Sequence, residues 1–314
     1  MRFLALMFLL CSCHLREAPL HKTGAQVEGV YTLDYKYEKA SQYNYQKELI
    51  DSTSTGKIIE YKLKANDELL LNERHIHLKA YINSDPKSHL LLIQPISKGK
   101  YRISEFVANY FFARGWSCMI IKREEAYKKI FTPEALNLQM NELLLDSRHI
   151  VDFLENEKPF EYSDIAMFGI SKGGIKTSMI MGYEKRINAA VIVLAGGDLS
   201  RLLTESKEKG IIKARKKYMA ENESDLDSLR DELCEKLTVD PLMMAPYVDG
   251  SRTLHILAYF DQSVPYRYGE QLFEAMPGAK SYTVLAGHYS AILFLPFILN
   301  RSEAFYEKKL LRIE

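Results

Sequence analysis

Continuous apolar runs recur along the chain at intervals that leave room for a helix between them. Such runs are typical of strands buried on both faces of a sheet, and they occupy residues 90–93, 116–121, 165–168, 189–194 and 254–260. Two earlier segments, 58–63 and 76–82, alternate apolar with polar positions and predict a half-exposed hairpin. With a last short strand at 282–285, the pattern predicts eight strands.

Helical patterns fill the gaps between these strands. They cover residues 103–114, 133–156, the stretch after Ile175, 268–276 and a final segment from about 290. Pro133 suits the first turn of its helix, and Gly115 suits the left-handed position that ends the first helix. Alternating strands and helices predict the α/β class, with a doubly wound, mostly parallel sheet covered by helices on both sides.

One stretch breaks this alternation. Residues 201–236 follow the sixth strand and are helical and heavily charged. A charged run is usually a solvated helix face, so its position carries more information than its charge. An insertion after the sixth strand would lie above the carboxyl edge of the sheet. We therefore expect residues 198–250 to form a helical cap that shapes a substrate pocket.

The chain then divides into five segments. Residues 13–55 are polar and rich in tyrosine and lack sustained periodicity, so a spacer and an ordered arm along the body both remain open. The expected boundaries are a signal peptide at 1–12, a tether or N-terminal arm at 13–55, the first part of the core at 56–197, the cap at 198–250 and the second part of the core at 251–314.

Composition narrows the class of protein without identifying it. An apolar content of 47% with 26% charged residues is ordinary for a globular chain, and a net charge of +1 argues against binding nucleic acid. The eight histidines form no zinc-binding spacing. His75 and His77 stand two apart on a predicted strand, which favours a solvated strand face over a metal pair. We expect no metal and no cofactor.

The N-terminus differs from the rest of the chain. Met1-Arg2 is followed by eight apolar residues, too few to cross a bilayer, and this pattern predicts a secretory signal. The following Leu10-Cys11-Ser12-Cys13 resembles the bacterial lipobox, although Cys11 stands where alanine, serine or threonine is more common. The resemblance implies cleavage before Cys13 and a lipid anchor on it, on the periplasmic or cell-surface side; the alternative is plain secretion with Cys13 unmodified.

Two further cysteines would remain in the mature chain. Cys118 lies in an apolar strand and Cys234 in a charged helical segment. Because these contexts differ, nothing in the pattern brings the two sulfurs together. The sequence predicts no disulfide framework.

The most informative motif is Gly-x-Ser-x-Gly at residues 169–173. It lies between a buried strand and a helix, the context of a nucleophile elbow. In such a turn the neighbours must lack bulky side chains, and Gly169 and Gly173 meet that demand. Ser171 would then stand at the carboxyl edge of the sheet, with the backbone N–H of Lys172 directed at an oxyanion. The same five residues also fit an ordinary Gly-rich turn, so other motifs are needed to distinguish a nucleophile elbow from such a turn.

A nucleophilic serine needs a base that accepts its proton and an acid that orients the base. Asp261 directly follows the strand at 254–260, and His288 follows the strand at 282–285. Both would therefore lie at the same sheet edge as Ser171. Asp198, after the sixth strand, is a reserve acid, although its position before Leu199 favours a helix N-cap.

Taken together, Gly-x-Ser-x-Gly-Gly, Asp-x-x-Val-Pro and Gly-His resemble the motifs of α/β-hydrolases over about residues 56–314 without the cap. The resemblance implies Ser171 as nucleophile, His288 as base and Asp261 as acid. It also implies a second oxyanion donor after the third strand, where many members carry His-Gly. This chain has Gln94-Pro95-Ile96 there, and proline has no N–H, so the donor would be Ile96 beside Lys172.

The expected function is an exported serine hydrolase that cleaves a carboxylic ester of a small acyl substrate through an acyl-enzyme. Two alternatives share the fold: a thioesterase or acyltransferase, whose elbows Gly-Ile-Ser-Lys-Gly-Gly also resembles, and a peptidase. A third, from another class, is a surface lipoprotein that binds ligands on this scaffold without turnover. An intact triad argues against the third.

Overall fold

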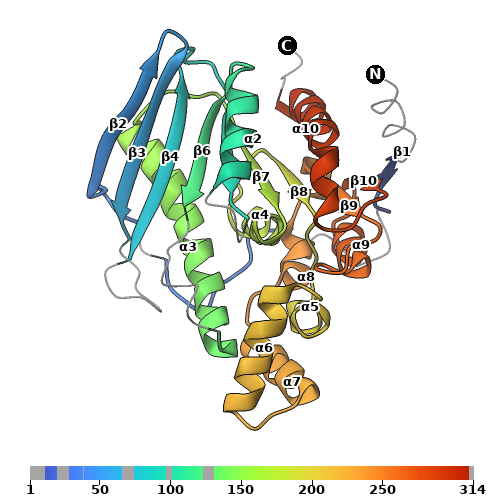
Figure 1. Ribbon diagram of the computed structural model, residues 1–314. Helices are drawn as coiled ribbons and strands as arrows, with labels where there is room; N and C mark the ends of the chain where they lie inside the picture. The colour runs from blue at the N-terminus through green and yellow to red at the C-terminus, as the bar shows by residue number, and fades with distance from the viewer. Residues whose placement is uncertain are drawn as a thin grey trace.

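The computed structural model describes residues 11–19, 28–37, 39–65, 74–96, 101–122 and 131–310. Its strands are β1 (Cys11–Glu17), β2 (Tyr45–Thr53), β3 (Gly56–Lys64), β4 (His75–Asn83), β5 (Leu90–Gln94), β6 (Ser117–Lys122), β7 (Ile165–Ile170), β8 (Ala189–Val193), β9 (Thr253–Ala258) and β10 (Lys280–Val284). They form one sheet in the order β1-β10-β9-β8-β7-β5-β6-β4-β3-β2 (Figure 1).

The middle of this sheet is parallel. Strands β6, β5, β7, β8, β9 and β10 pair in parallel, whereas β2, β3 and β4 form antiparallel pairs at one end and β1 pairs antiparallel with β10 at the other. All eight predicted strands are present, with ends that differ from the expected ones by no more than two residues. The prediction of a mostly parallel α/β sheet is confirmed.

Helices cover both faces of the sheet. They are α2 (Arg102–Phe112), α3 (Pro133–Glu157), α4 (Lys172–Tyr183), α5 (Leu199–Glu205), α6 (Lys209–Glu221), α7 (Leu226–Lys236), α8 (Pro241–Met244), α9 (Tyr266–Glu274) and α10 (Leu295–Leu310). Side chains of α3, α4 and α9 bury one face, and those of α2 and α10 bury the other. Gly115 adopts φ of +87° just after α2, as its place in the sequence predicts.

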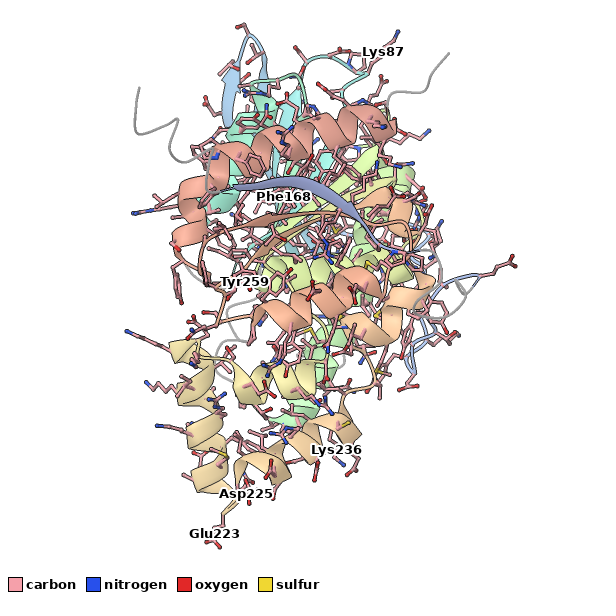
Figure 2. The ribbon with its side chains drawn as sticks, turned by 90° about the vertical axis from the view of Figure 1, so that its right-hand side faces the viewer. Lys87, Phe168, Glu223, Asp225, Lys236 and Tyr259 are labelled. Carbon is pink, nitrogen blue, oxygen red and sulfur yellow. The ribbon has the colours of Figure 1, made fainter. Side chains whose placement is uncertain are left out.

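The insertion after β8 forms a helical cap. Helices α6 and α7 project beyond the sheet at the bottom of Figure 1, and Glu223 and Asp225 lie at its far tip in Figure 2. Both ends of the insertion meet at Asp240, whose carboxylate accepts hydrogen bonds from the amides of Asp198 (3.1 Å) and Leu199 (2.5 Å). The one helical stretch expected at 201–236 is divided into α5, α6 and α7.

The region before β3 contains a strand that the sequence did not predict. Strand β2 pairs with β3 at the edge of the sheet, and nearly all its side chains are exposed, so it shows no apolar alternation to recognise. Upstream of it, Tyr37 donates a hydrogen bond to the buried carboxylate of Asp152 on α3. The hydroxyl of Tyr43 lies 3.0 Å from Nδ1 of His149 on the same helix. These described residues of segment 13–55 therefore lie along the body.

Strand β1 is the other strand that the sequence did not predict. Its backbone pairs with β10 through Cys11 with Val284 and Ser12 with Thr283, and then, after an irregularity, through Arg16 with Ser281. Residues 1–10, the apolar part of the predicted signal peptide, lie outside the described residues. In the described part of the chain, no helix combines the length and the apolar character needed to cross a membrane.

A buried ion pair fastens the start of β4 to α3. Arg74 is buried with its Nε 3.5 Å from the carboxylate of Glu142, which is also buried, and it pairs with Asp146 one helical turn later. We expect Arg74→Leu to lower the free energy of unfolding by about 3–5 kcal/mol, because it leaves a carboxylate buried without its cation. Urea denaturation measures the change.

The matched control is Arg201→Leu. Arg201 also pairs with a carboxylate, that of Asp198 at 3.6 Å, but its side chain is exposed. Exposed pairs contribute less than about 1 kcal/mol, so this variant should unfold near the wild-type midpoint. Equal destabilisation by the two variants would contradict the account of Arg74.

Candidate active site

The turn between β7 and α4 holds the serine in a strained backbone conformation. Ser171 adopts φ 57° and ψ −122°, which is uncommon for any residue other than glycine and costs roughly 1–3 kcal/mol. Its amide donates to the carbonyl of Val193 on the adjacent β8 (2.8 Å), and its own carbonyl accepts from Ile175 (3.0 Å). These bonds fix the turn, so the hydroxyl stands at the carboxyl edge of the sheet at the amino end of α4.

Close backbone packing explains the two glycines of the motif. A Cβ on Gly169 would lie 2.3 Å from the carbonyl oxygen of Gly173, and a Cβ on Gly173 would lie 2.3 Å from that of Gln94. These two carbonyl oxygens belong to the backbone, so they cannot move aside as the end of a flexible side chain could. The motif is therefore a structural requirement of this turn, and it brings the first turn of α4 against the end of β5.

The structure brings Ser171, His288 and Asp261 together. The Oγ of Ser171 lies 2.9 Å from Nε2 of His288, and the Nδ1 of His288 lies 2.6 Å from Oδ2 of Asp261. Both distances are within hydrogen-bond range. The three residues come from three separate strand ends, after β7, β9 and β10. In this arrangement the N–H at Nδ1 of the imidazole donates to the Asp261 carboxylate. The unprotonated Nε2 can then accept a hydrogen bond from the Ser171 hydroxyl.

A tight turn holds the carboxylate of Asp261 in place. Its Oδ1 accepts hydrogen bonds from the amides of Ser263 and Val264, each at 2.9 Å, while Oδ2 faces the histidine. The Asp side chain is buried, and an Asx turn of this kind needs only an Asp or Asn at its first position. The sequence Asp-x-x-Val-Pro therefore carried a signal for the orientation of the acid, which sequence reasoning missed.

Asp198 caps the start of α5. Its carboxylate accepts from the hydroxyl of Ser200 (2.8 Å) and from the amide of Arg201 (3.3 Å) at the start of α5. The interpretation of Asp198 as an N-cap is confirmed. The acid that meets His288 in the structure is Asp261.

The expected oxyanion donors, Lys172 and Ile96, belong to two segments that pass close to each other. Lys172 is the first residue of α4, where backbone N–H groups and the helix dipole favour negative charge. Ile96 follows Pro95, whose carbonyl oxygen lies 3.0 Å from the Cβ position of Gly173. Segment 94–96 thus passes alongside the turn that carries Ser171.

The cap touches the catalytic loops directly. The amide of Lys207 donates to the carbonyl of Gln262 (2.8 Å), and the hydroxyl of Tyr289 donates to the carboxylate of Glu208. That hydrogen bond, together with partial desolvation, raises the pKa of Tyr289 to about 12. The junction between α5 and α6 therefore borders both the acid loop and the residue after His288. No sequence motif signals these contacts.

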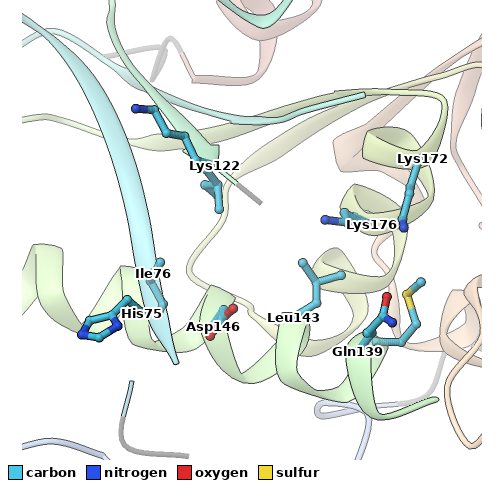
Figure 3. A pocket seen from close by; sticks show the side chains of 10 residues that line it. His75, Ile76, Lys122, Gln139, Leu143, Asp146, Lys172 and Lys176 are labelled. Carbon is cyan, nitrogen blue, oxygen red and sulfur yellow. The ribbon is translucent and has the colours of Figure 1, made fainter. Parts of the chain in front are cut away.

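A pocket opens on the other side of the elbow, toward α3. Lys172 and Lys176 of α4 line it together with Asp146 and Leu143 of α3 and His75 of β4 (Figure 3). Figure 3 shows the side chain of Lys176 directed across the pocket. The side chain of Lys172, which the sequence places in the elbow, therefore borders this cavity, whose lining residues do not include Ser171, Asp261 or His288.

Other candidate residues lie apart from the triad. His75 and His77 are half-buried on β4 with ring centroids 6.3 Å apart, and the described residues contain no group of three metal-ligating side chains. Cys118 is buried and Cys234 is exposed, both as free thiols. The backbone of Cys13 lies in β1, but its side chain is outside the described part.

Comparison with known proteins gives matches in structure only. No family model matches the sequence, and no curated protein matches it. An acetyl xylan esterase from Paenibacillus sp. R4 superposes with a TM-score of 0.65 at 16% identity, over 86% of this chain and 90% of that one. A cold-adapted esterase from an Arctic intertidal metagenomic library gives 0.56 at 15%, over 86% and 99%. An esterase of Pyrococcus furiosus gives 0.52 at 13%, over 92% and 100%. The sheet order, the elbow and these similarities together show that the chain has the α/β-hydrolase fold.

Proposed function

We propose that the protein is a serine hydrolase that cleaves carboxylic esters through an acyl-enzyme. The observation that carries the proposal is the hydrogen-bonded series Ser171–His288–Asp261 at the carboxyl edge of the sheet. The solved structures with a similar fold include several esterases, which supports this reaction class.

The reaction follows from the positions of the groups. Nε2 of His288 accepts the hydroxyl proton while Oγ of Ser171 attacks the ester carbonyl carbon. The backbone N–H groups of Lys172 and Ile96 stabilise the negative charge on the carbonyl oxygen, and Asp261 stabilises the imidazolium. The imidazolium then gives its proton to the departing alkoxide, which leaves as the alcohol. Water, deprotonated by the same histidine, attacks the acyl-serine. The bond to Oγ of Ser171 then breaks, the imidazolium returns its proton to that oxygen, and the carboxylic acid is released.

A fluorophosphonate probe tests the nucleophile. The probe phosphonylates an activated serine with loss of fluoride, so we expect stoichiometric labelling of wild type at Ser171 and none of Ser171→Ala. Esters, thioesters and amides of one acyl group then define the reaction class, with the ester expected to react fastest. A folded wild-type protein that takes no label and hydrolyses none of these substrates would instead indicate a binding protein.

We also propose that the protein is exported and anchored through a lipid on Cys13. The charged start, the short apolar segment and the lipobox-like Leu10-Cys11-Ser12-Cys13 support this. Cleavage before Cys13 would remove the pairs of Cys11 and Ser12 with β10 and leave those of Arg16 with Ser281 and Glu17 with Lys280.

In a bacterial host, Cys13→Ser should abolish incorporation of a labelled fatty acid and move the protein from the membrane to the soluble fraction. Lipidation needs the thiol at the cleavage site, whereas Cys11→Ser places a residue favoured in lipoboxes and should keep both label and membrane location. Fatty-acid labelling that persists in Cys13→Ser would exclude this anchor.

A further inference from the structure

The sequence around His288 is unusually apolar. Residues 281–300 contain no Lys, Arg, Asp or Glu. Much of this stretch is buried as β10 and the start of α10, but Leu285, Tyr289, Ile292 and Leu293 are exposed. Large apolar side chains on a solvated surface need an explanation, because burying them would be favourable.

A second loop extends this surface. Tyr259 and Phe260, which follow β9, are also exposed. Their amides donate to the carbonyls of Val284 (3.0 Å) and Ala286 (2.9 Å), so the two loops lie side by side. We call Tyr259, Phe260, Leu285, Tyr289, Ile292 and Leu293 the apolar rim.

The apolar rim borders the candidate active site. Phe260 directly precedes Asp261, and Tyr289 directly follows His288, with ring centroids 5.6 Å apart. Whatever covers the rim therefore lies beside the catalytic groups.

The path of β1 indicates what covers the apolar rim. Because β1 runs antiparallel to β10, with Arg16 opposite Ser281, the residues that precede Arg16 lie toward the carboxyl end of β10, and cleavage before Cys13 leaves this direction unchanged. Cys13 is then within roughly 10 Å of Leu285 along the strand direction. A lipid on Cys13, as proposed above, would enter a bilayer next to the rim. Strand β2 lies at the opposite edge of the sheet from β1 (Figure 1).

We propose that the apolar rim binds the surface of a lipid bilayer, and that the substrate is an amphiphilic ester taken from that bilayer. The substrate part rests on the proposed ester hydrolase activity; the bilayer part does not. Tyrosine and aliphatic side chains suit the boundary between headgroups and acyl chains. Since residues 281–300 carry no charged side chain, we expect binding to zwitterionic lipid with little dependence on salt.

A fluorophore at position 293 tests the bilayer part. The mature chain from residue 13 would carry Cys13→Ser and Cys234→Ser, with Leu293→Cys labelled by a polarity-sensitive dye; Cys118 is buried and does not react. With phosphatidylcholine vesicles we expect a blue shift of the emission and quenching by brominated lipid. Unchanged emission at saturating vesicles would overturn the proposal.

The matched control is the same label at Leu49→Cys. Leu49 is 61% exposed, against 63% for Leu293, but it lies on β2 at the far edge of the sheet, so its emission should not shift. A shift at both positions would indicate contact unrelated to the rim. A shift at position 293 that grows with protein concentration in the absence of vesicles would assign the surface to contact between copies. Either result contradicts a bilayer-binding rim.

Hydrolysis tests the substrate part. The pair Ile292→Ser with Leu293→Ser should lower the rate on a long-chain ester in phosphatidylcholine vesicles at least about tenfold, because both side chains lose apolar burial. The rate on a water-soluble short-chain ester should stay within about twofold, as for other surface changes. Leu49→Ser with Ile50→Ser, matched in exposure at 61% and 47% against 63% and 46%, should change neither rate.

Two outcomes separate this inference from the proposed function. Equal rates of the rim variant and wild type on the vesicle ester would contradict the substrate part while leaving the hydrolase intact. A wild-type protein that hydrolyses neither ester would contradict the hydrolase, and with it the substrate part, while the fluorescence result still decides whether the rim meets a bilayer.

Discussion

Replacing Ser171 by alanine should lower kcat for ester hydrolysis by about 10⁶-fold, because the variant loses the atom that forms the acyl bond. The fold should survive, since alanine occupies the same strained backbone conformation and the amide of residue 171 still donates to Val193. Initial rates on a soluble ester, with thermal unfolding measured alongside, check both statements.

The control for this experiment is Ser251→Ala. Ser251 is exposed at the amino end of β9, the end opposite Asp261, and its loss should leave kcat within about twofold of wild type. A folded Ser171→Ala protein that retains more than about one per cent of wild-type kcat would refute the nucleophilic role.

Replacing Asp261 by asparagine should lower kcat by about 10⁴-fold with little change in KM. The turn explains why. Oδ1 is held by the amides of Ser263 and Val264, so the asparagine would keep its oxygen there and direct its NH₂ group at Nδ1 of His288. The imidazole must then carry its proton on Nε2, where it can no longer accept the proton of Ser171. Steady-state kinetics on a soluble ester measure the loss.

Asp198→Asn is the matched control, because asparagine caps a helix as well as aspartate does. Its activity should stay within about twofold of wild type, since Asp198 bonds to Ser200 and Arg201 at the start of α5. If Asp198→Asn lowered kcat more than Asp261→Asn does, the acid that orients His288 would be Asp198, which follows the sixth predicted strand.

Much of the fold was predictable because buried strands leave a strong local signal. Strands such as β5 and β8 are apolar at every or nearly every position since both faces are covered, and their apolar runs identify them directly. Strand β2 is exposed along almost its whole length, so it has no apolar pattern; it forms because β3 offers it unpaired backbone groups. Strand β1 likewise depends on the edge of β10.

The sequence by itself determined the α/β class, the elbow around Ser171 and the short set of polar residues that follow strands. These depend on local chemistry: apolar periodicity, and glycines where a Cβ would strike backbone. The tertiary structure decided which polar residues meet. It brought the Asp261 carboxylate against His288 and placed Glu208 of the cap against Tyr289. Such contacts join residues far apart in the chain, so only the packing of the strands and the cap fixes them.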